Sequence, residues 1–233
     1  MADIASALTY FIVFLFSTTL HEAGHAWAAK LGGDLTAYHG GQVSLDPRPH
    51  IQREPFGMLV LPLISTLISG WPFGFASAPY DPRWAMRYPR RAAWMALAGP
   101  TANLGLVVLA ILCIRAGVLA GVFHAPESAS FGHLVGAEPG SMWPGVGFLV
   151  SVVFSLNLVL ACLNLIPLPP LDGSGVVMLL MPDSTANRYQ QFLWQNQMLG
   201  FAGMIIAWQA FDAIFDPIFR TAINLIYPGA SYG

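Results

Sequence analysis

The chain has 233 residues, of which 55% are hydrophobic and only 9% are charged. Because a typical soluble domain is about a quarter charged, this composition excludes a soluble globular protein and indicates a polytopic membrane protein. The formal net charge of −2 and the lack of a basic run give no indication of a nucleic-acid partner.

Four apolar segments are long enough to cross a hydrocarbon core of about 30 Å, which takes roughly 20 helical residues. They cover residues 4–29, 92–114, 146–166 and 197–215. A fifth apolar run, from Phe56 to Trp71, is short and interrupted by Pro62, so we expect a re-entrant segment there. The last apolar region continues to about Tyr227, and we expect Pro217 to break it.

The first apolar segment contains an HExxH motif at residues 21–25. Residues four apart project from the same face of a helix, so His21 and His25 can bind one metal ion. Glu22 is offset by one position, where it can hold a water molecule instead of the ion. Random order would give roughly 0.003 such motifs per chain, and a Glu at membrane depth by default marks function. The motif therefore predicts a zinc site in the first span.

A short polar connection follows the first span, with Gly40 and Gly41 between residues 38 and 45. Gly-Gly is typical of two-residue hairpin turns, so we expect a small membrane-associated β-hairpin here. An edge strand of that hairpin could pair with an extended peptide substrate. A plain connection between helices would carry the same residues.

The basic residues are distributed asymmetrically along the chain. Residues 116–145 contain no Lys or Arg, whereas seven basic residues lie between the first two spans: Lys30, Arg48, Arg53, Arg83, Arg87, Arg90 and Arg91. The positive-inside rule then places residues 30–91 in the cytoplasm and residues 116–145 outside. This orientation requires the 56–71 run to enter and leave on the same side.

A catalytic zinc site takes a third protein ligand, for which Asp172 is the best candidate. It follows three prolines within residues 167–170, which cannot continue a regular helix. Unwound backbone at membrane depth is tolerated only where it is buried in protein or lines a cavity. The third span also ends on the side where the HExxH helix ends. A Pro-rich turn with a capping Asp-Gly pair would explain the same residues without a metal.

Two further motifs accompany HExxH. Asn164 begins the pattern NxxPxPPLDG that contains Asp172, and residues 99–103 read GPTAN. Together these motifs resemble the site-2 protease family of intramembrane zinc metalloproteases, over about residues 4–182. The lack of PDZ and CBS modules is similar to the minimal prokaryotic type.

The resemblance implies a role for each motif residue. His21, His25 and Asp172 would be the zinc ligands, Glu22 the general base, and Asn164 a group that contacts the substrate backbone. An Asn within a span also often serves only as a hydrogen-bonding contact between helices.

We therefore predict an all-α polytopic membrane protein with about four to six transmembrane helices, a small membrane-associated β-hairpin and a re-entrant segment. Residues 1–233 would form a single membrane-embedded metalloprotease domain. It would use Zn²⁺ to hydrolyse peptide bonds within or near transmembrane segments of membrane proteins, close to the cytoplasmic face of the cell membrane. Its expected partners are a transmembrane protein substrate and the lipid bilayer, and assembly into a homo-oligomer stays open. The alternatives are a metal-binding membrane transporter and a non-catalytic scaffold.

Overall fold

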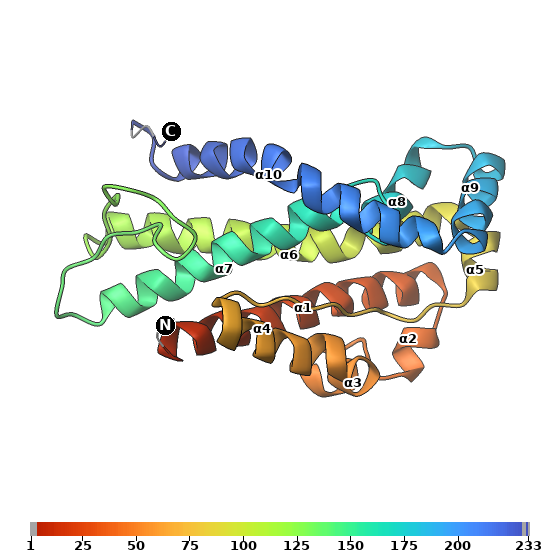
Figure 1. Ribbon diagram of the computed structural model, residues 1–233, viewed down its shortest axis with the longest axis horizontal. Coiled ribbons are helices and arrows are strands. Elements are labelled where there is room, and N and C mark those ends of the chain that lie inside the picture. Colours follow the sequence, from red (N-terminus) through yellow and green to blue (C-terminus); the bar gives the residue numbers. More distant parts are fainter. Residues whose placement is uncertain (1–3, 230–231, 233) are drawn as a thin grey trace.

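The computed structural model describes residues 4–229 and 232. Four helices are long and apolar enough to cross a membrane: α1 (Ile4–Gly32), α6 (Pro89–Leu119), α7 (Trp143–Asn164) and α10 (Met198–Ile226). They coincide with the four predicted spans, which are confirmed. Figure 1 shows the long helices lying along one another and forming an elongated bundle.

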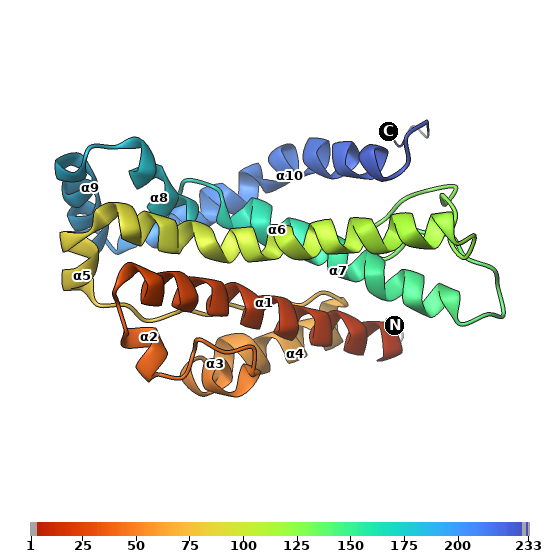
Figure 2. The same ribbon diagram turned by 180° about the vertical axis from the view of Figure 1, so that it is seen from behind.

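Short helices gather at one end of this bundle. α5 (Pro82–Arg87) leads into α6, and α9 (Asp183–Gln195) leads into α10. Between α7 and α9 lie α8 (Gly173–Val176) and a 3-10 turn (Val177–Leu180). We call this the α5/α9 end. The opposite end holds the start of α1, the irregular segment between α6 and α7, and the end of α10 (Figures 1 and 2).

Small residues allow α1 and α6 to pack closely. A Cβ atom added at Gly24 of α1 would lie 3.0 Å from the Ala98 carbonyl oxygen of α6. Ala26 and Ala29 on the same helix are completely buried. Small residues at a helix interface let the backbones approach, which maximises van der Waals contact where lipid supplies no hydrophobic driving force.

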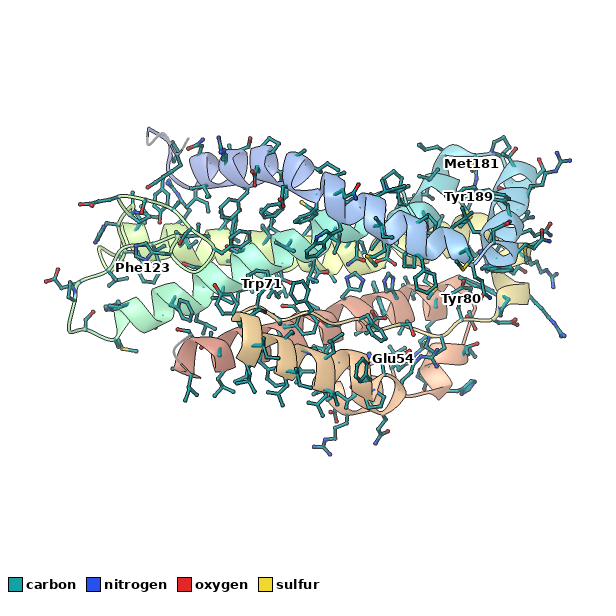
Figure 3. The ribbon with its side chains drawn as sticks, viewed as in Figure 1. Glu54, Trp71, Tyr80, Phe123, Met181 and Tyr189 are labelled. Carbon is teal, nitrogen blue, oxygen red and sulfur yellow. The ribbon has the colours of Figure 1, made fainter. Side chains whose placement is uncertain are left out.

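Residues 56–81 first run along the bundle away from the α5/α9 end and then turn back toward it. A π-helical turn (Phe56–Val60) continues as α4 (Leu61–Ser69), which ends at Gly70 with a φ of +74°. Residues 72–81 then return without regular secondary structure. Trp71 and Tyr80, labelled in Figure 3, lie near the two ends of this extended segment. Glu54 and Tyr80 both lie on the α5/α9 side of Trp71 (Figure 3), and the re-entrant course of this segment in a membrane stays a prediction.

The β-hairpin expected within residues 38–45 is not confirmed. α2 (Thr36–His39) occupies its first part, and turns lead from it to α3 (Pro47–Arg53); residues 4–229 contain no β-strand. Asp34 explains the helical turn, because its Oδ1 accepts hydrogen bonds from both the backbone N–H and the hydroxyl of Thr36. Gly41, with a φ of +74°, does make a turn, but no strands flank it.

The expectation that Pro217 breaks the last helix is wrong, since α10 continues through it. The residues on either side hold the helix in place. Phe215 and Phe219 both stack on Phe131, with ring centroids 5.6 Å and 5.0 Å away. Packing of the residues on either side favours a continuous helix although Pro217 lacks a backbone N–H to donate.

Candidate metal centre

Two side chains of α1, His21 and His25, meet Asp172, which lies in the turn before α8 and 151 residues from His21 in sequence. Nε2 of His21 lies 3.0 Å from Nε2 of His25 and 3.0 Å from Oδ2 of Asp172. Nε2 of His25 lies 3.3 Å from Oδ1 of Asp172. The structure thus places the three residues selected from the sequence beside one another.

The proline-rich segment delivers Asp172 to this position. α7 ends at Asn164, and residues 165–172 form consecutive turns. The next residue, Gly173, has no room for a side chain, because a Cβ atom there would collide with the carbonyl oxygens of Leu165 and Ile166. The tight turn of the chain therefore requires the glycine of the Asp-Gly pair, and the aspartate supplies the carboxylate.

The protonation of His25 is fixed by the backbone. Its Nδ1 lies 2.7 Å from the Met95 carbonyl oxygen, which can only accept a hydrogen bond. Nδ1 therefore carries the proton, and Nε2 presents a lone pair to the site.

The donor set fits a tetrahedral metal ion such as zinc. Zinc binds imidazole nitrogen and carboxylate oxygen at about 2.0–2.2 Å, so tetrahedral ligand atoms are separated by roughly 3.3 Å. The three separations found here, 3.0–3.3 Å, are close to that spacing. Lone pairs this close repel one another unless a cation or a proton lies between them.

Gly99 of α6 leaves the space in front of the histidines open. A Cβ atom at this position would collide with the Nε2 atoms of both His21 and His25. Any side chain at position 99 would thus occupy the place that an ion needs. The first residue of the GPTAN motif therefore places backbone without a side chain next to the metal centre.

Glu22 lies beside the ligand atoms, and one of its carboxylate oxygens forms no hydrogen bond with any described group. It is 4% exposed, and its Oε2 has no hydrogen-bond partner within residues 4–229. A carboxylate oxygen of Glu22 and one nitrogen each of His21 and His25 lie within 4.8 Å of one another. A buried carboxylate with a free acceptor atom is suited to hold and deprotonate a water molecule.

A cavity of about 650 Å³ contains these groups. Its walls come from α1, residues 74–80, α6, the end of α7 with the proline-rich segment, and single residues of α9 and α10. Asn164 also lines it, and its Nδ2 donates to the Leu160 carbonyl over 3.0 Å. The structure thus places Asn164 at the cavity but shows no contact between it and the metal ligands.

The sequence did not indicate two further parts of the cavity wall. One is the extended segment 74–80, whose only local signals are Gly70 and Gly74 and the prolines around it. The other is Gln190 of α9, which is buried and whose Oε1 has no partner in the described part of the chain. No periodicity or motif distinguishes Gln190 from its neighbours.

The remaining histidines do not line the cavity. His50 is buried against the Ser44 carbonyl, 3.0 Å from its Nε2. His124 and His133 belong to the irregular segment between α6 and α7. None of these residues lines the cavity that holds His21 and His25.

Comparison with known proteins agrees with this geometry. YwhC of Bacillus subtilis strain 168, named as a candidate zinc metalloprotease, is 31% identical over 235 residues, covering 96% of this chain and 95% of the relative. Rip2 of Mycobacterium tuberculosis strain H37Rv, which has the same type of name, is 35% identical over 161 residues, covering 69% of this chain and 52% of the relative. The chain therefore matches only about half of the length of Rip2.

No solved structure matches the chain. The model of peptidase family M50, in contrast, matches residues 9–207 and so includes every residue of the metal centre. The chain therefore belongs to peptidase family M50, the site-2 protease family that its motifs resemble.

Proposed function

We propose that this protein is a zinc metalloprotease that hydrolyses peptide bonds within or near the transmembrane segments of membrane proteins. The observation that carries the proposal is the arrangement of two imidazoles, a carboxylate and a free Glu22 oxygen in a cavity walled by membrane-spanning helices. The family match supports the peptidase reaction, and the names of YwhC and Rip2 support zinc as the metal.

We assign the metal ligands to His21, His25 and Asp172. Zinc held there supplies Lewis-acid chemistry, which lowers the pKa of water toward about 7 and polarises a carbonyl oxygen. Glu22 takes a proton from the attacking water at its unpartnered Oε2. It then donates this proton to the leaving amine nitrogen as the peptide C–N bond breaks.

The position of the site along α1 suits a reaction that consumes water. His25 lies seven residues before the end of α1 at Gly32, which is about 10 Å along a helix. Lys30, the basic residues of α5 and α9, and Arg90 and Arg91 in the first turn of α6 lie at that same end. By the positive-inside rule we assign the α5/α9 end to the cytoplasm. Cysteines at Pro49 and Tyr80 should then react with an impermeant thiol reagent from the cytoplasmic side only.

A substrate helix must be unwound before its carbonyl groups become accessible, and the segment 74–80 could hold the extended form. Backbone groups of Phe75 and Ser77 face away from the cavity, since they hydrogen-bond to the Gly57 carbonyl and the Arg53 guanidinium. Successive residues of an extended chain alternate in direction. The backbone groups of Ala76 and Ala78 therefore point the opposite way from those of Phe75 and Ser77, toward the cavity. The N–H groups of these two alanines donate no hydrogen bond to any described residue.

We therefore assign to this segment the substrate pairing that the sequence suggested for residues 38–45. Asn164 and Gln190, which also line the cavity, are assigned to contacts with the same unwound backbone. Main-chain pairing of this kind provides affinity without a strict sequence requirement.

The Glu22→Gln variant tests the proposed function. Its amide cannot accept a proton, yet it leaves His21, His25 and Asp172 in place, so we expect full zinc content and no cleavage. Membrane proteomes of cells that produce the wild type or the variant should differ by fragments cut in or next to transmembrane segments. Loss of zinc together with activity would make Glu22 a ligand. Identical fragment patterns would instead favour a metal-binding transporter.

A further inference from the structure

A chain of buried amide side chains connects α7 to His21. Nδ1 of His21 lies 2.6 Å from Oδ1 of Asn103, on α6. Nδ2 of Asn103 donates to Oδ1 of Asn157, on α7, over 2.8 Å. Nδ2 of Asn157 in turn donates to the Val153 carbonyl over 2.8 Å and to the Ser17 hydroxyl over 2.9 Å. Asn103 and Asn157 are both 0% exposed, so bulk water does not compete for these bonds.

The direction of this chain is set at its far end. A backbone carbonyl has no proton to donate, so Asn157 must turn its nitrogen to Val153 and its oxygen to Asn103. Asn103 must then present its nitrogen to Asn157, and the Ser17 carbonyl, 3.4 Å from that nitrogen, favours the same orientation. The oxygen of Asn103 consequently faces His21, and Nδ1 of His21 must carry the proton.

A neutral imidazole protonated at Nδ1 has its lone pair at Nε2, which is the nitrogen facing His25 and Asp172. We propose that Asn157 and Asn103 are positioning residues that hold His21 in the tautomer that binds zinc through Nε2. The inference rests on the proposed zinc site. It gives a role in metal binding to Asn157, which contacts neither the metal ligands nor the cavity.

The two histidines differ in how this tautomer is obtained. His25 depends on one backbone carbonyl, that of Met95, which mutation of a side chain cannot remove. His21 depends on the side chains of Asn103 and Asn157, which belong to two other helices. Asn103 is 82 residues from His21 in sequence, and Asn157 is 54 residues from Asn103. His21 is therefore the ligand whose zinc affinity can be changed from a distance.

The Asn157→Leu substitution tests the relay. Leucine has a similar branched shape but neither donates nor accepts a hydrogen bond. Only the 3.4 Å contact with the Ser17 carbonyl then opposes rotation of the Asn103 amide, which can present its nitrogen to His21. This orientation favours the tautomer that must give up the proton on Nε2 before it binds zinc. Outer-shell substitutions of this kind lower metal affinity by roughly 10–100-fold. We expect a loss in this range when Zn²⁺ is titrated against a chromophoric chelator.

Ser155→Ala is the matched control. Ser155 lies two residues away on the same helix, is completely buried, and has a hydroxyl without a hydrogen-bond partner among the described residues. Its removal should leave zinc affinity unchanged. An equal loss in both variants would mean that packing of α7, rather than the amide chain, controls the site.

A double-mutant cycle separates orientation from packing more sharply. In Asn103→Asp, both side-chain oxygens of the ionised group are acceptors, so the atom facing His21 accepts whichever way the group is turned. Asn157→Leu should therefore change zinc affinity less than about twofold in this background, and the difference from its larger effect in the wild type is the non-additivity expected of two coupled residues. A tenfold loss in both backgrounds would overturn the proposed relay.

The tautomer itself can be read without any variant of Asn157. Nitrogen-15 NMR of the zinc-loaded protein, with the His21 signals assigned by comparison with His21→Ala, should show the proton on Nδ1. A proton on Nε2 would overturn the inference even if Asn157→Leu failed to fold. If the wild type binds no zinc, the proposed function fails. If the wild type binds zinc and Asn157→Leu binds it equally well, only the relay fails.

Discussion

The two walls of the cavity are built in different ways. α1, α6 and the turn after α7 supply the metal centre, and they are joined by close glycine contacts and a buried amide chain. The other wall consists of the extended residues 74–80 with Gln190 and Met204 from α9 and α10. Only five residues of α10 are buried: Gly203, Ala207, Phe215, Ile223 and Ile226.

This difference corresponds to two requirements of the reaction. Metal ligands and a general base must be held in fixed positions, because a small displacement removes catalysis. A substrate must also enter and be held as an extended chain, which calls for a wall with available backbone groups. We therefore expect substitutions in the first wall to act on zinc and kcat, and those in the second wall to act on KM.

Removing Asp172 should have the largest effect. In Asp172→Ala the histidines would form an open two-ligand site, so zinc affinity should fall by more than the roughly 100-fold seen on loss of an outer-shell partner. Cleavage should fall to background, as measured by metal analysis and peptide release. Asp183→Ala is the control, because Asp183 is exposed and pairs with the exposed Arg90. Full zinc content in Asp172→Ala would contradict the ligand assignment.

Gly99→Ala should disrupt the first wall without removing any ligand. Its methyl group would collide with Nε2 of both His21 and His25. We expect zinc affinity to fall by about the 10–100-fold typical of disturbed ligand geometry. Gly105→Ala on the same helix should have no such effect, because a Cβ atom there meets nothing within 4 Å. Normal zinc binding in Gly99→Ala would show that α6 can move away from α1.

The sequence alone predicted the first wall far better than the second. His21, Glu22 and His25 are related by helical spacing, and the prolines before Asp172 indicate an unwound segment. Both signals are local and depend on residue types with strong preferences. The orientation of α1 and α7 then sufficed to bring Asp172 to the histidines.

The remaining features depend on contacts between distant residues. Gly40 and Gly41 favour a turn, but Asp34 starts a helical turn just before them, so the expected hairpin did not follow. Residues 74–80 are held extended by Gly57 and Arg53, which local periodicity cannot reveal. Asn103 is marked in the sequence only as the end of the GPTAN motif, and Asn157 looks like an isolated polar residue, so their contact is not visible there.

A proline in the extended segment should affect the second wall. Ala76→Pro removes one backbone N–H that faces the cavity but is compatible with extended backbone. A lost hydrogen bond costs about 0.5–1.5 kcal/mol, so kcat/KM should fall roughly threefold to tenfold, mainly through KM, with zinc affinity unchanged. Ala76→Ser retains the N–H group and should behave like the wild type. Equal kinetics for both variants would remove this segment from substrate binding.

The smallest effect is expected at Gln190, where two adjacent glutamines offer a matched pair. Gln190 is buried and lines the cavity, whereas Gln191 is exposed on the same helix. If Oε1 of Gln190 accepts a hydrogen bond from the substrate, Gln190→Ala should raise KM by about twofold to fivefold, the lower part of the range for one neutral hydrogen bond. Zinc affinity and kcat should not change.

Gln191→Ala should change neither KM nor kcat, since its side chain does not line the cavity. A fall in zinc affinity in Gln190→Ala would place this residue with the metal centre instead of the substrate. Equal KM values for the two variants would mean that α9 only covers the cavity. The contrast between walls would then depend on residues 74–80 alone, because they would be the remaining polar groups opposite the metal ligands.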